Sequence, residues 1–146
     1  MPIAPTPPPR LRSGLARALA ALTAAYTAVL VLATHYPSPE LFLGTRPPSD
    51  KALHFMAYGL LGLLAGGTLA LARQWSAPRA LGLAAVLAIF AALDEITQPF
   101  FRRDAEPLDW VCDCLGVACG LAAVAVGVLV VRLIRGRYAQ LGVGGR

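Results

Sequence analysis

Four long apolar stretches limit what this chain can fold into more than any other feature of its sequence. They lie at about residues 15–34, 51–71, 80–98 and 108–133. Each approaches the roughly 20 predominantly apolar residues that a helix needs to cross a bilayer. The apolar runs are unbroken rather than alternating, which favours helices over barrel strands. Only 14% of the residues are charged, against about 25% in soluble domains. The sequence therefore predicts an all-α membrane protein, a four-transmembrane-helix bundle.

The links between these stretches are too short for a separate soluble domain, so residues 15–138 are predicted to form one membrane domain. Residues 1–14, rich in proline, are expected to be a disordered cytoplasmic tail, and residues 139–146 a second cytoplasmic tail. Arg10 and Arg12 precede the first apolar stretch and Arg17 lies at its start, as in a secretory signal peptide. That stretch is long for a signal and no small-x-small cleavage site follows it, so we expect an uncleaved membrane anchor.

Basic residues orient the predicted bundle, because cytoplasmic loops carry an excess of Lys and Arg. Nine of the 13 basic residues lie in the two terminal regions or between the second and third stretches, and four lie on the opposite side. Both termini are thus predicted on the cytoplasmic side of the inner membrane. The net charge of +5 is then a topology signal. No nucleic-acid partner is expected, since no basic run is interleaved with exposed aromatics.

All eight acidic residues fall between positions 40 and 113, and none lies on the predicted cytoplasmic side. The segments 1–39, 51–93 and 114–146 contain no acid at all. Acids from segments far apart in sequence should therefore meet at the outer face of the membrane. Glu40, Asp104 and Glu106 are expected on the loop surface. The acids expected to converge are Asp50, Asp94, Glu95, Asp109 and Asp113.

Three motifs bring these acids to one level of the bundle. They are Asp50-Lys51-x-x-His54-x-x-x-Tyr58, Asp94-Glu95-x-x-Gln98 and Asp109-x-x-x-Asp113-x-x-Gly116-x-x-x-Gly120. At about 100° per residue, the members of the first and last motif each share one helix face. Glycines let helices approach closely, and a charge that faces lipid costs several kcal/mol. The polar side chains should therefore point into the bundle, with Lys51, Arg102 and Arg103 as counter-ions.

These motifs, with Phe55, Phe101 and an arginine before Asp109, resemble the VanZ-like family of small bacterial membrane proteins over about residues 50–120. That family is named after a member associated with resistance to the lipoglycopeptide antibiotic teicoplanin, so the resemblance implies a role in the cell envelope. The position of Asp113 is often asparagine in the family, so this chain carries an extra negative charge or a bound proton there. Of the adjacent Arg102 and Arg103, the second fits the spacing to Asp109. Carried over by position, the family's polar residues are Asp50, Lys51, His54, Tyr58, Asp94, Glu95, Gln98, Arg103, Asp109 and Asp113.

Three functions are compatible with this cluster. The first is binding of an anionic or amphipathic cell-envelope molecule, an envelope lipid or a glycopeptide-type ligand, in an outward-facing polar cavity. The second is a membrane enzyme that acts on lipid-linked phosphate headgroups. In it His54, Asp50, Asp94 and Glu95 are catalytic, and the ligand is held by Lys51, Tyr58, Gln98, Arg103, Asp109 and Asp113. The third is a structural or accessory membrane subunit, in which the polar groups only satisfy one another.

No motif predicts a cofactor or a metal site. The sequence has no His-x-x-x-His or Cys-x-x-Cys pair of the kind that binds zinc, although its carboxylates could serve Mg²⁺ or Ca²⁺. Cys112, Cys114 and Cys119 are expected as small packing residues, because they cannot close a disulfide well within one helix. His35, at the outer end of the first stretch, can reach the cluster. Membrane lipids surround the predicted bundle, and a homo-oligomer would supply the further helices that a transporter needs.

Overall fold

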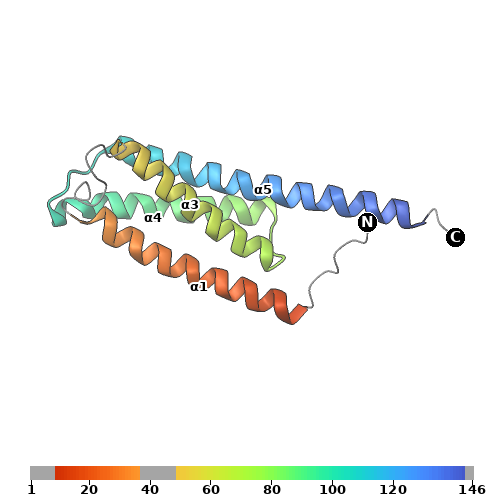
Figure 1. Cartoon of the computed structure of the whole chain (residues 1–146). Coiled ribbons are helices and arrows are strands. Elements are labelled where there is room, and N and C mark those ends of the chain that lie inside the picture. Colours follow the sequence, from red (N-terminus) through yellow and green to blue (C-terminus); the bar gives the residue numbers. More distant parts are fainter. Residues whose placement is uncertain (1–8, 37–48, 144–146) are drawn as a thin grey trace.

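The computed structural model describes residues 9–36 and 49–143 of the chain. These residues form four long helices and one short 3₁₀ helix, with no strand in the described ranges (Figure 1). The elements are α1 (Pro9–Thr34), α3 (Asp50–Leu71), α4 (Ala77–Thr97), the 3₁₀ helix η1 (Gln98–Phe101) and α5 (Pro107–Val143). Each of the four long helices is long and apolar enough to cross a membrane. The prediction of an all-α protein with four helices long and apolar enough to span a membrane is therefore confirmed.

Two helices extend into segments that the sequence predicted as tails. α1 begins at Pro9, within the expected tail 1–14, because proline in the first helical turn lacks only an N–H that would have no partner there. α5 continues to Val143, past the expected end near residue 133, since the residues beyond include good helix formers such as Arg135, Arg137, Ala139 and Gln140. Its 37 residues give a length of about 55 Å, and Figure 1 shows it passing beyond the other helices. Residues 1–8 and 144–146 lie outside the described part.

α3 is the central helix of the bundle. It packs most extensively on α5 and next on α1, while α4 packs mainly on α5. Glycines allow the closest of these contacts. A Cβ added at Gly116 would lie 2.8 Å from the backbone nitrogen of Gly59, and one added at Gly120 would lie 2.6 Å from that of Leu63. The α3 and α5 backbones therefore touch along this glycine seam, where no side chain fits between them.

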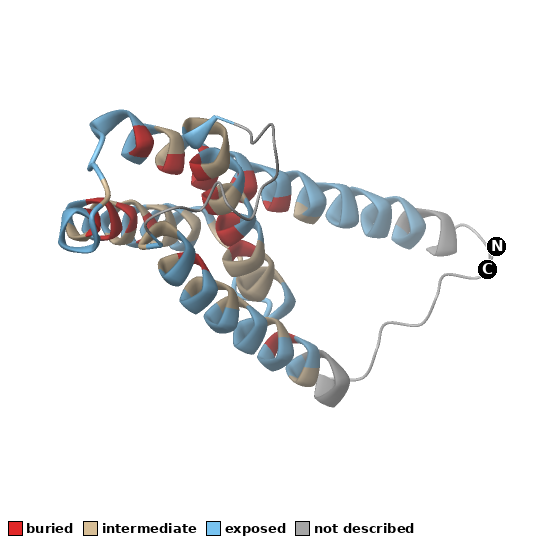
Figure 2. Ribbon diagram, turned by 60° about the vertical axis from the view of Figure 1, so that its left-hand side comes forward, coloured by how far each residue is buried: buried red, intermediate tan, exposed pale blue. Residues whose placement is uncertain are grey.

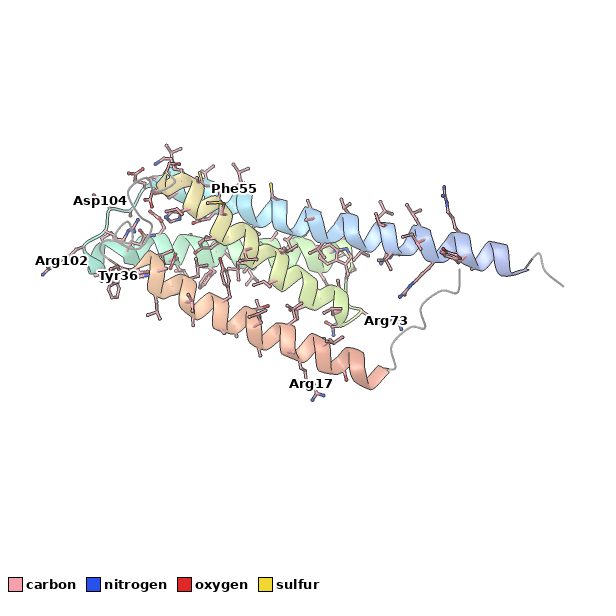
Figure 3. The ribbon with its side chains drawn as sticks, viewed as in Figure 1. Arg17, Tyr36, Phe55, Arg73, Arg102 and Asp104 are labelled. Atoms are coloured by element: carbon pink, nitrogen blue, oxygen red, sulfur yellow. The ribbon has the colours of Figure 1, made fainter. Side chains whose placement is uncertain are left out.

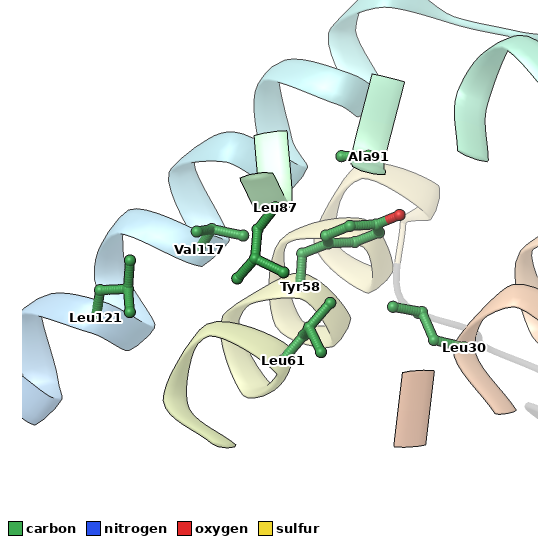
Figure 4. Close-up of a cluster of buried hydrophobic side chains, with 7 residues drawn as sticks. All are labelled: Leu30, Tyr58, Leu61, Leu87, Ala91, Val117 and Leu121. Carbon is green, nitrogen blue, oxygen red and sulfur yellow. The ribbon is translucent and has the colours of Figure 1, made fainter. Parts of the chain in front are cut away.

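The apolar core is small and lies around α3. Figure 4 shows its seven members, which are Leu30, Tyr58, Leu61, Leu87, Ala91, Val117 and Leu121. Most other large apolar side chains are exposed. Figure 2 places the buried residues on the faces that the helices turn to one another, and leaves the C-terminal part of α5 exposed. Such extensive exposed apolar surface suits a protein that lipid surrounds.

Candidate functional site

The polar cluster lies at one end of the bundle, where α3 and α5 begin and α1 and α4 end. This end is opposite the first turn of α1 and the last turn of α5 (Figure 1). The described part of the chain has six buried polar side chains, and all of them lie here. They are His54, Asp94, Glu95, Gln98, Asp109 and Asp113. A buried polar group without a partner costs free energy, so the partners of these six define the site.

His54 and Asp113 form the buried centre of the cluster. Ser49 caps the start of α3 by accepting a hydrogen bond from the backbone N–H of Ala52, and His54 lies just over one turn further along. Its Nδ1 is 3.0 Å from Oδ1 of Asp113 on α5. The two residues are only 5% and 0% exposed. The second carboxylate oxygen of Asp113, Oδ2, is buried and has no hydrogen-bond partner in the described structure.

Asp94 is held by helices α1 and α3. Its Oδ2 accepts a hydrogen bond from the hydroxyl of Tyr58 at 3.0 Å, and its Oδ1 accepts one from Thr34 Oγ1, also at 3.0 Å. His35 Nδ1 is 3.5 Å from Oδ1 of Asp94, and His35 Nε2 is 2.9 Å from Thr97 Oγ1. The reach of His35 to the cluster is therefore confirmed. Thr34 and Thr97 were not anticipated, because an isolated threonine at a helix end gives no sequence signal.

Glu95 is held by the chain that follows it. Gln98 Nε2 donates to Oε2 of Glu95 at 2.9 Å, and the backbone N–H of Glu106 donates to Oε1. The turn that makes this possible follows η1, which ends at Arg102 in the left-handed conformation with φ of 63°. The 3₁₀ turn and the reversal after it bring the link between α4 and α5 back over the cluster.

The two fixed cations of the site lie at its rim. Lys51 Nζ is 2.7 Å from Glu106 Oε2 and 3.5 Å from Asp109 Oδ1. Arg103 Nη2 is 3.1 Å from Oδ2 of Asp50. Asp50 is exposed, so this member of the expected inner set lies at the rim. Glu106 is exposed as expected for a loop residue, yet its side chain also holds Lys51.

The structure separates the two adjacent arginines of the α4–α5 link. Arg103 pairs with Asp50 and is mostly buried at its side chain, at 12% exposure. Arg102 is exposed and points away from the bundle, as Figure 3 shows. Arg103 is therefore the arginine that belongs to the cluster.

Negative charge exceeds fixed positive charge in this cluster. Lys51 and Arg103 contact only rim acids and Asp109. In the described part of the chain, no lysine or arginine forms an ion pair with Asp94, Glu95 or Asp113, which are the acids deepest in the bundle. The negative charges of these three acids must therefore be balanced by histidine, by hydroxyl and amide hydrogen-bond donors, or by a bound ligand or cation.

A cavity of about 520 Å³ adjoins the cluster between α1 and α3. Its wall is mostly apolar, and its polar groups come from the ends of the two helices and the α4–α5 link. It is lined by Val29, Leu30, Leu32, Ala33, Thr34, Tyr36, Asp50, Leu53, His54, Ala57, Tyr58 and Arg103. Val29 and Leu32 are 60% and 72% exposed, so the apolar side of the cavity reaches the surface of the bundle. The cavity thus joins an apolar wall to the rim of the polar cluster.

Two groups of side chains could hold a metal ion. Asp50, His54 and Asp109 form one, and His54, Glu95 and Asp113 form the other, each with its donor atoms within 4.8 Å of one another. In the second group every donor comes from a different helix. A local ligand spacing could not have revealed it.

Comparison of the chain with known protein families, curated proteins and solved structures finds no significant match. What the fold and the site define is a four-helix multi-pass membrane protein with a buried acidic cluster at one end and an amphipathic cavity beside it.

Proposed function

We propose that this chain is a VanZ-like protein of the bacterial cytoplasmic membrane that binds an amphipathic cell-envelope molecule in the cavity between α1 and α3. One observation carries the proposal, which is that this cavity has an apolar wall and ends at Asp50, His54 and Arg103. Ligand pockets combine an apolar lining with a few polar groups that fix orientation. The hydrocarbon part of the ligand lies along Val29 and Leu32, and its headgroup lies at the polar end.

Arg103 is the residue that we assign to an anionic headgroup. A guanidinium presents several N–H donors in a plane that matches phosphate and carboxylate oxygens. Its present partner, Asp50, is exposed, and exposed ion pairs contribute at most about 1 kcal/mol. Arg103 can therefore exchange Asp50 for a headgroup oxygen at little cost, while the acids around it favour a headgroup that also brings hydrogen-bond donors.

Lipid binding by purified variants tests this proposal. The full chain in detergent is delipidated and titrated with a polyprenyl phosphate, the matching polyprenol or phosphatidylethanolamine, and bound lipid is counted by native mass spectrometry. We expect the phosphate-bearing lipids to bind more tightly than the polyprenol. Arg103→Gln should weaken their binding about tenfold, because a charge-assisted hydrogen bond is lost. Ala33→Phe should weaken binding by placing an aromatic ring in the cavity.

The chain offers a matched control for each variant. Arg102→Gln removes the neighbouring arginine, which lies outside the cavity, and Ala28→Phe adds the same ring to an exposed position of α1 that does not line it. Neither should change lipid binding. Equal losses in Arg102→Gln and Arg103→Gln, or undiminished binding in Ala33→Phe, would rule out the cavity as the lipid site.

Catalysis on the same headgroup is the second candidate function. The observation that favours it is the contact between His54, which lines the cavity, and Asp113, since a carboxylate that orients an imidazole is typical of an activated base or nucleophile. Incubation with polyprenyl phosphate substrates separates the two functions. Turnover that His54→Ala abolishes supports an enzyme, and binding without product supports a binding protein.

We also propose that both termini face the cytoplasm and that the polar cluster faces outward. The excess of basic residues at the terminal ends supports this orientation. In a variant with Cys112, Cys114 and Cys119 changed to alanine, Asp104→Cys should react with a membrane-impermeant maleimide in intact cells whose outer membrane has been permeabilised. Ser76→Cys, in the α3–α4 link at the other end, should react only after lysis. The reverse pattern of labelling would overturn the orientation.

A further inference from the structure

Three helices bring metal-ligand types together at the deepest point of the cluster. His54 comes from α3, Glu95 from α4 and Asp113 from α5, and all three residues are buried. One donor atom from each lies within 4.8 Å of the other two. The residues are separated widely in sequence, and only the folded bundle assembles them.

A second observation points to a ligand at this place. Asp113 is 0% exposed, and its Oδ2 has no hydrogen-bond partner in the described structure. No lysine or arginine pairs with Glu95 or Asp113 among the described residues. An ionised carboxylate in such a place is costly unless a positive charge or a proton joins it. A cation that binds the unpartnered oxygen of Asp113 would therefore neutralise a buried charge that is otherwise uncompensated.

The donors are also held as metal ligands usually are. Glu95 accepts one hydrogen bond on each oxygen, from Gln98 and from the backbone of Glu106, which fixes its carboxylate and still leaves lone pairs free. His54 Nδ1 and Asp113 Oδ1 are 3.0 Å apart. Two ligand atoms about 2.1 Å from a shared ion lie roughly 3.0 Å apart at right angles and roughly 3.4 Å apart at a tetrahedral angle. A cation can therefore replace the hydrogen between them without large movement.

We propose that His54, Glu95 and Asp113 bind a divalent cation of the Mn²⁺ or Zn²⁺ type. One imidazole nitrogen with carboxylate oxygens suits these ions better than Mg²⁺ or Ca²⁺, which prefer oxygen ligands alone. The other group around His54 is less suitable, because Lys51 lies 3.5 Å from Asp109 and Arg103 pairs with Asp50. His54 also lines the α1–α3 cavity, which gives the ion a route to the site. The proposed cation site does not depend on lipid binding, so either proposal can be disproved while the other stands.

Metal titration of the full-length protein tests the site. Protein purified in detergent is stripped with a chelator and titrated with MnCl₂, ZnCl₂, MgCl₂ or CaCl₂. Binding is followed by the metal content after desalting, by the Mn²⁺ paramagnetic resonance signal and by the thermal unfolding midpoint. We expect one equivalent of Mn²⁺ or Zn²⁺ and a midpoint raised by about 3 °C or more at saturation. Asp113→Asn and Glu95→Gln should each weaken binding at least tenfold.

Two neighbouring acids serve as controls. Asp104→Asn removes an exposed loop charge, and Asp109→Asn removes a buried acid of the competing group. Asp104→Asn should keep its cation affinity within about threefold of the parent, and Asp109→Asn, which removes a nearby charge but no ligand, should weaken binding less than Asp113→Asn or Glu95→Gln does. The site is wrong if no cation binds stoichiometrically, if Asp113→Asn and Glu95→Gln bind like the parent, or if only Asp109→Asn loses binding. If Asp113→Asn does not fold, Glu95→Gln decides by the same criterion.

Discussion

Gly120→Ala is expected to lower the free energy of unfolding by about 2 kcal/mol or more. A methyl group on this residue would lie 2.6 Å from the backbone nitrogen of Leu63 and 3.0 Å from the carbonyl carbon of Gly62. Backbone atoms of α3 cannot rotate away as a side chain can, so the two helices must separate. Overpacking of this kind typically costs about 1–3 kcal/mol, and separation also loosens the polar cluster above the seam. Equilibrium unfolding in mixed micelles, followed by circular dichroism, measures the loss.

Gly127→Ala is the matched control for this variant. Gly127 lies on the same helix, α5, is exposed and has nothing within 4 Å of an added Cβ. Alanine is favoured over glycine in a helix by about 1 kcal/mol, so this substitution should leave stability unchanged or raise it slightly. Equal effects of the two alanines on the free energy of unfolding would contradict the close approach of α3 and α5.

His54→Leu is expected to lower the free energy of unfolding by about 3–5 kcal/mol. Leucine removes the one hydrogen-bond partner that the described structure gives Asp113, whose side chain is fully buried. The carboxylate is then left without any partner in the described structure, since its other oxygen already has none. The same unfolding measurement gives the magnitude.

A double-mutant cycle shows whether the loss comes from this pair. Asp113→Asn alone keeps the shape of the side chain, and its amide oxygen can still accept a hydrogen bond from His54. Combined with His54→Leu, it removes the buried carboxylate charge that has lost its partner. The double variant should therefore be at least about 2 kcal/mol more stable than His54→Leu. His35→Leu is the comparison within the chain. In this variant Asp94 keeps its hydrogen bonds from Tyr58 and Thr34, so the free energy of unfolding should fall much less than in His54→Leu. Simple additivity of the two single changes would show that His54 and Asp113 do not interact.

The fold could be predicted from the sequence because burial in lipid requires apolar stretches of a definite length. The helix ends could not be placed as well. Pro9 and Val143 lie outside the apolar stretches, so the hydrophobic pattern does not predict where these two helices begin and end. The glycine pattern on α5 indicated which face packs inward, and Gly116 and Gly120 do lie against α3.

The deepest part of the cluster was also accessible from the sequence. A charge that cannot face lipid has to face the bundle, which places His54, Glu95 and Asp113 inside, as the structure finds. The pairing of these residues was not accessible, because it depends on how far each helix is rotated and shifted. Nor could the sequence show that the backbone of Glu106 reaches Glu95, since that contact depends on the turn at Arg102.

The distribution of the polar residues along the helices has a consequence for how the protein is made. His54 lies near the start of α3, Glu95 near the end of α4 and Asp113 near the start of α5. Each helix can thus leave the translocon with its polar residues at the headgroup level, where water still reaches them, rather than at mid-membrane, where a charge costs about 3 kcal/mol. α3 is synthesised before α5, so the contact between His54 and Asp113 can form only after α5 has been inserted. Charge is therefore buried when the helices assemble, after each has been inserted.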